Sequence, residues 1–131
     1  MRKLLVVLIT IALQTSAAAA TYARSPSASD NAAGNGSNLM KTSAESALNT
    51  AYRDAKKRIE TAYSADADLG RRYLQTLLDS QRGWLKYRDG QCDLEAFLAE
   101  EGTKANDQLT DGCVSKMDRE RIVQLNAMPY Q

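Results

Sequence analysis

Apolar side chains recur at three- and four-residue steps after residue 42, the spacing of one face of an α-helix. This stripe consists of Leu48, Ala51, Tyr52, Ala55, Ile59, Ala62 and Tyr63. Thr42 and Glu45 match a capping box, so the helix is predicted to begin at Thr42 and to end near Ser64. The opposite face carries Arg53, Asp54, Lys56, Lys57 and Arg58. We expect it to be solvated, and the alternative is a binding surface.

A second, longer helix is predicted from Leu69 to about Glu100. Asp66 or Asp68 can cap its start, and Gly102 can adopt the left-handed conformation that ends a helix. Gly90 lies inside it and is consistent either with a kink or with a continuous helix that approaches a neighbour closely.

The apolar repeat from Leu109 to Met117 predicts a third helix, Lys104 to Lys116, with Thr103 as its cap. Asp118 is expected to cap a last helix, Arg119 to Asn126. No stretch alternates as a strand would. The expected fold class is therefore all-α, a small antiparallel bundle of three to four helices.

Three polar residues fall inside the apolar stripe of the second helix when each residue is advanced by about 100°. They are Gln81, Arg88 and Glu95. A buried polar group is costly unless it is paired. One interpretation is an internal network in which Arg88 bonds a carboxylate or helix-end carbonyls. The other places these side chains on a recognition surface.

The N-terminal residues have the features of an export signal. Arg2 and Lys3 precede an apolar run from Leu4 to Leu13, and small residues around Ala20 suit signal-peptidase cleavage. We therefore expect a signal peptide at 1–20 and a periplasmic or secreted protein with no stable membrane insertion after cleavage. Residues 21–41 are rich in Ala, Ser, Asn and Gly and are expected to form a flexible linker. The helical domain is expected to cover 42–131.

The composition narrows the function classes. The chain has 17 basic and 16 acidic residues and no His, so nucleic-acid binding and His-based catalysis or metal binding are not expected. Two Cys cannot by themselves form a structural zinc site. We expect no catalytic residues, no metal, no cofactor and no enzymatic activity.

Cys92 and Cys113 are the two cysteines of the sequence. In an exported small domain an even pair most simply forms a disulfide. A redox-active pair is the alternative, but the spacing is far from C-x-x-C and no His is present to activate a thiolate.

Charge is unevenly distributed. From residue 89 to residue 111 there are seven acidic side chains against one basic side chain, whereas residues 71–88 are mainly basic. An acidic lobe can steer a cationic partner, and the alternative is a solubilising surface. The candidate lobe comprises Asp93, Glu95, Glu100, Glu101, Asp107 and Asp111.

The segment from Leu77 to Cys92 carries a pattern of mixed residue types. It resembles the signature L-x-x-(A/S)-Q-R-x-W-x-x-(Y/F)-R-D-x-x-C of the LprI-like lysozyme-inhibitor family, and the resemblance extends over 44–125. The signature residues are Gln81, Arg82, Trp84, Tyr87, Arg88 and Asp89. Many members have further cysteines before the first helix, and this chain has none there. The resemblance implies an exported helical domain with a disulfide.

The resemblance also implies lysozyme inhibition, although it assigns no inhibitory residues. The leading hypothesis is a binding protein that occludes a muramidase, with a cationic lysozyme or another cell-wall hydrolase as its partner. The alternatives are a structural or envelope-stress protein of the periplasm, and an immunity protein against a wall-degrading toxin. The six signature residues either form a recognition surface or hold the helices together.

Overall fold

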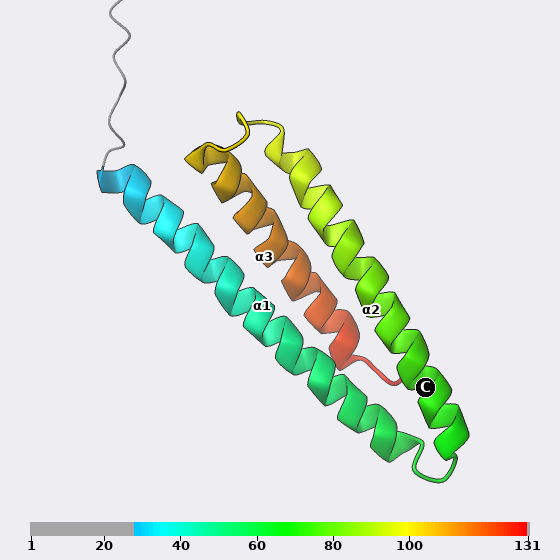
Figure 1. Cartoon of the computed structure of the whole chain (residues 1–131). Helices are drawn as coiled ribbons and strands as arrows, with labels where there is room; N and C mark the ends of the chain where they lie inside the picture. The colour runs from blue at the N-terminus through cyan, green and yellow to red at the C-terminus, as the bar shows by residue number, and fades with distance from the viewer. Residues whose placement is uncertain (1–27, 131) are drawn as a thin grey trace, which may run out of the picture.

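A computed structural model describes residues 28–130 of the chain. Within this range it contains three helices, α1 (Ala28–Ala62), α2 (Ala67–Ala96) and α3 (Lys104–Asn126). Consecutive helices run antiparallel, and α3 lies between α1 and α2 and packs most extensively against α1 (Figure 1). The predicted small all-α bundle is confirmed. The expected signal peptide and residues 21–27 of the expected linker lie outside the described residues.

Helix α1 begins earlier than the sequence pattern indicates. Residues 28–41, expected to belong to a flexible linker, are helical. The Thr42 hydroxyl donates to the Asn38 carbonyl at 2.9 Å, so Thr42 lies within the helix and the predicted N-cap there is wrong. Contacts with α3 accompany the extension, including an ion pair of 3.0 Å between Lys41 and Asp111. Tertiary packing of this kind stabilises helices whose sequence alone favours them weakly.

Helix α2 is capped as predicted by one of the two candidate aspartates. The Asp66 carboxylate accepts the backbone N–H of Leu69 at 2.9 Å. The helix continues through Gly90 and ends at Ala96, four residues before the predicted end. Gly102 has a φ of 75° and occupies the turn that follows, so its left-handed conformation shapes the turn and does not end the helix.

Helix α3 is continuous from Lys104 to Asn126, so the predicted break at Asp118 is wrong. Thr103 caps the helix as predicted, because its side chain accepts the N–H of Asn106. Asp118 lies in the interior of the bundle and bonds Arg88 on α2. A short polar side chain such as Asp is typical of a cap, but here a cation on a neighbouring helix holds it.

The core has two apolar parts. The larger part includes Leu48, Ile59, Leu77 and Leu125, and the smaller part surrounds Cys92, Cys113 and Val114. Along both α2 and α3, buried polar residues lie between these two parts. The interior is thus an apolar cluster, a polar layer and a second apolar cluster stacked along the bundle axis.

One residue of the α1 face that was expected to be solvated is half-buried. Arg58 donates to the carbonyl of Leu125 at 2.8 Å and to that of Met128 at 3.0 Å. The carbonyls at the end of a helix lack partners within the helix and attract cations. Arg58 therefore joins α1 to the end of α3, which corrects the expectation for this residue.

Candidate functional site

The polar layer is centred on Arg88 of α2. Its Nη1 donates to Asp118 Oδ1 at 2.8 Å, and its Nε and Nη2 donate to Asp89 Oδ1 at 2.9 and 2.7 Å. Glu45 of α1 approaches Nη1 at 3.9 Å. Burial lowers the pKa of Arg88, but the hydrogen bonds and charges of Asp118 and Asp89 outweigh this effect and leave the pKa above its usual value. Arg88 is therefore a fixed cation that joins all three helices.

Asp118 depends strongly on this cation. Its side chain is fully buried, and its second oxygen, Oδ2, accepts no hydrogen bond within the described part of the chain. A buried carboxylate without compensating partners is unstable. Arg88 is consequently the charge that makes the interior position of Asp118 tolerable.

A second arginine of the layer, Arg121 of α3, is held by neutral groups. It donates to Gln81 Oε1 at 3.0 Å, Gln124 Oε1 at 2.7 Å and Ser80 Oγ at 3.1 Å. Burial lowers the pKa of Arg121, and the charge of Tyr130 offsets this only in part. The bond to Gln81 explains why a polar residue of α2 lies in the apolar stripe.

Trp84 connects the two arginines. The guanidinium carbons of Arg88 and Arg121 both lie 5.7 Å from the centre of its ring. A cation at this distance from an indole ring is attracted by the ring's quadrupole. The layer thus joins α2 to α3 through an ion pair, neutral hydrogen bonds and the Arg121–Trp84 cation–π contact, while the Arg88–Trp84 contact lies within α2.

The structure divides the six signature residues into two groups. Gln81, Trp84, Arg88 and Asp89 take part in the polar layer. Arg82 and Tyr87 are exposed on α2. For Gln81 and Arg88 the internal network is observed, whereas Glu95 is exposed and bonds Gln91 of the same helix, so its predicted place in the buried stripe is wrong.

The acidic residues predicted to form one lobe do not share one surface. Asp93, Glu100 and Glu101 line a cavity of about 650 Å³ at the α2–α3 turn. Asp107 lies beside a different hollow, between α1 and α3. Asp111 lines that second hollow too, but it is buried and paired with Lys41. Three acidic residues of the predicted lobe therefore lie together at the turn.

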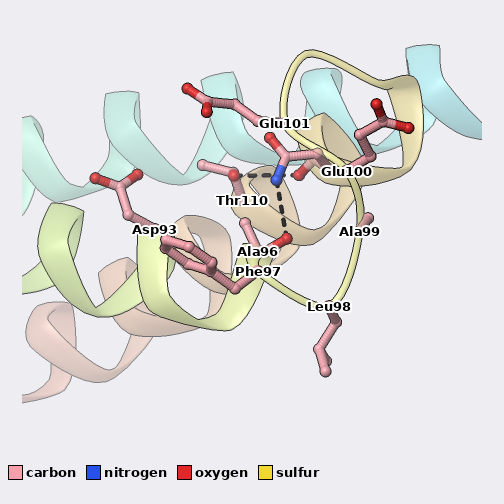
Figure 2. Close-up of a pocket in the computed structure, with 9 residues that line it drawn as sticks. Asp93, Ala96, Phe97, Leu98, Ala99, Glu100, Glu101 and Thr110 are labelled. Atoms are coloured by element: carbon pink, nitrogen blue, oxygen red, sulfur yellow. Dashed lines mark hydrogen bonds between the residues drawn. The ribbon is translucent and has the colours of Figure 1, made fainter.

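The α2–α3 turn, residues 97–103, is fixed by many local bonds. The Asn106 side chain donates to the Ala96 carbonyl at 2.8 Å, and the Thr103 hydroxyl donates to the Glu100 carbonyl at 2.6 Å. Below the turn, the predicted disulfide is confirmed and joins Cys92 to Cys113 with Cα atoms 5.4 Å apart. Hydrogen bonds within the turn and the disulfide beside it therefore fix its backbone, and Figure 2 shows the side chains that line the cavity there.

The sequence interpretation missed the two most exposed large apolar residues of the turn. Phe97 is 83% exposed and Leu98 is 86% exposed. On the phase count used for the second helix, Phe97 falls near 280°, well outside the stripe at roughly 60–160°. This off-stripe position was the signal that could have identified it.

Residues 28–130 contain neither a metal-binding cluster nor a helix suited to span a membrane. No group of three or more His, Cys, Asp or Glu side chains could hold a metal ion there. Across the same residues, no helix is long and apolar enough to cross a membrane.

These features define a disulfide-tied three-helix domain whose exposed turn combines apolar and acidic side chains. The chain belongs to the family of the lysozyme inhibitor LprI, whose family model matches residues 16–125. The family is described as a lysozyme-inhibitor family, which is not a class of enzymes.

Two proteins are similar to this chain, one in sequence and one in structure. An uncharacterized protein of Rhizobium meliloti (strain 1021) is 32% identical over 88 residues, which cover 65% of this chain and 63% of that protein. The match thus spans less than two thirds of that relative. The crystal structure of a DUF1311 family protein from Pseudomonas putida KT2440 superposes with a TM-score of 0.68 at 21% identity, covering 76% of this chain and 93% of that one. The second likeness shows a shared fold.

Proposed function

We propose that this protein is an exported binding protein that inhibits a lysozyme by occluding its active-site cleft. The observation that carries the proposal is membership of the LprI lysozyme-inhibitor family over residues 16–125. Occlusion requires no catalytic chemistry from the inhibitor, because it only has to keep the polysaccharide away from the two carboxylates that glycosidases use.

The segment from Asp93 to Asp111 is the proposed occluding element. It contains the α2–α3 turn at one end of the bundle (Figure 1). The Cys92–Cys113 disulfide joins the two ends of the segment. A turn already held in one conformation loses little entropy when it binds. A fixed conformation and a position at the end of the bundle are the properties expected of a segment that fills an enzyme cleft.

The charge of the turn favours a basic enzyme as the partner. Asp93, Glu100 and Glu101 are exposed, and none of them forms an ion pair with another described residue. Exposed charges of one sign accelerate association with a partner of opposite sign, and their effect weakens as salt is added.

Export is part of the proposal. The disulfide supports it, because structural disulfides persist mainly in oxidising compartments. N-terminal sequencing of the protein recovered from the periplasm or medium tests the expected cleavage near Ala20. Recovery only from the cytoplasm, with Met1 still present, would contradict export.

The function is tested by adding the purified protein to lysozymes of several types and following the clearing of a peptidoglycan suspension. We expect inhibition of at least one basic lysozyme at micromolar concentration in low salt, with a fixed stoichiometry at saturation. Full activity of every lysozyme type under these conditions would reject the proposed function.

A further inference from the structure

We propose that Phe97 and Leu98 form the apolar anchor of the inhibitor, inserted into the cleft of a basic lysozyme whose surface contacts the surrounding acidic residues. This proposal rests on the proposed function and names the side chains that perform it. It differs from a purely electrostatic mode of binding, in which the acidic residues alone would hold the enzyme.

Large apolar side chains are exposed at the end of α2 and in the turn that follows it. Phe97 and Leu98 are 83% and 86% exposed, and Leu94, one helical turn earlier, is 66% exposed. Scattered single apolar residues are normal on a protein surface, but a contiguous group marks a contact surface. Leu94, Phe97 and Leu98 lie within five consecutive residues, so exposed apolar area is concentrated at this end of α2.

Hydrogen bonds fix the backbone that carries Phe97 and Leu98. Phe97 N–H bonds the Leu94 carbonyl at 3.3 Å, and Ala99 N–H bonds the Ala96 carbonyl at 3.0 Å. The Asn106 side chain also holds the Ala96 carbonyl. Figure 2 shows the Leu98 side chain pointing away from the other drawn residues and the Phe97 ring extending beside Asp93. The apolar pair is therefore presented on an ordered backbone at low entropic cost.

The acidic side chains around Phe97 and Leu98 favour a partner with a basic surface. Asp93, Glu100 and Glu101 share the cavity lining with Phe97 and Leu98. Apolar tips can approach the two catalytic carboxylates of a glycosidase without the repulsion that an inserted acid would meet, while the acids at the side face the enzyme's basic surface. A symmetric dimer through this surface would bring the acids of two copies together, and an anionic membrane would repel them.

The test compares two double variants in the inhibition assay with a basic C-type lysozyme. Phe97→Ala/Leu98→Ala removes the proposed anchor. Leu39→Ala/Val123→Ala is the matched control, because it removes two large apolar side chains that are 69% and 71% exposed elsewhere on the bundle. Both variants should keep the circular dichroism spectrum and melting midpoint, since none of the four side chains is buried.

We expect the anchor variant to raise the inhibition constant about 30-fold or more, mainly through faster dissociation, and the control to change it less than about 3-fold. An unchanged inhibition constant for the anchor variant would overturn this proposal and leave the proposed function standing. Absence of inhibition by the unaltered protein would overturn both the apolar anchor and the proposed function. The measurement on the unaltered protein therefore separates failure of the function from failure of the anchor alone. Sedimentation of the unaltered protein with anionic vesicles, abolished in the anchor variant, would instead assign the pair to a membrane and overturn the lysozyme anchor.

Discussion

Arg88 on α2 and the fully buried Asp118 on α3 form the central ion pair of the bundle, with Nη1 of the arginine 2.8 Å from Oδ1 of the aspartate. The pair sits between the two apolar parts of the core, where each charge depends on the other. Removing one partner of a buried pair is more damaging than replacing both, because the remaining charge stays buried.

Arg88→Ala is expected to lower the free energy of unfolding by about 3–5 kcal/mol, because it leaves the fully buried Asp118 without the partner that compensates its burial. Urea denaturation followed by circular dichroism measures this. Arg82→Ala is the control, since Arg82 is exposed on the same helix, and it should change stability by less than about 0.5 kcal/mol. Equal effects for the two variants would contradict the role given to the pair.

Replacing both partners should recover much of the loss. Arg88→Met combined with Asp118→Leu leaves no buried charge and fills the space with apolar atoms. We expect the double variant to be more stable than Arg88→Ala, with an interaction energy of at least about 1 kcal/mol in the double-mutant cycle. Additive losses would show that the pair acts through packing alone.

Arg58 is expected to hold the C-terminal end of α3 against α1. Arg58→Ala removes the hydrogen bonds to the Leu125 and Met128 carbonyls and should cost about 1–3 kcal/mol. Lys57→Ala, one residue away and exposed, should cost less than about 0.5 kcal/mol. Hydrogen exchange should show faster exchange in the last turn of α3 in the Arg58 variant, and unchanged exchange there would argue against the docking role.

The disulfide should stabilise the fold as well as the turn. Thiol titration of the denatured, unreduced protein should find no free thiol, because both cysteines are paired. Cys92→Ser/Cys113→Ser should lower the free energy of unfolding by about 3 kcal/mol in the chain-entropy model for a sequence separation of 21 residues. Two titratable thiols in protein purified without reductant would be the opposite result.

If the protein inhibits a basic lysozyme, the acidic residues near the turn should control the encounter rate. Asp93→Asn/Glu100→Gln/Glu101→Gln should slow association roughly 10-fold at low salt and flatten its salt dependence. Glu60→Gln/Asp68→Asn/Asp79→Asn removes the same number of charges elsewhere and serves as the control. Stopped-flow measurement of the association rate distinguishes this effect from loss of the apolar anchor, which acts on dissociation. If the association rates of both triple variants depended equally on salt, steering by the turn would be rejected.

Much of the fold could be predicted from the sequence because helices reflect local periodicity and local capping chemistry. Local spacing and residue type were enough to predict the apolar stripe from Leu48 to Tyr63 and the helix caps at Asp66 and Thr103. The Cys92–Cys113 disulfide followed from the presence of two cysteines. The position of Arg88 inside the apolar stripe likewise indicated a need for a partner.

The identity of that partner was decided only by the tertiary structure. Asp118 has the residue type of a helix cap, and its local sequence favoured a break there, but a cation 30 residues earlier draws it into the interior of a continuous α3. Tertiary contacts also decided the helical state of residues 28–41 and the inward direction of the Arg58 side chain. In both cases the contacts join segments that are distant in sequence. Local propensity amounts to tenths of a kcal/mol per residue, so an interhelical ion pair or a buried contact prevails where the two disagree.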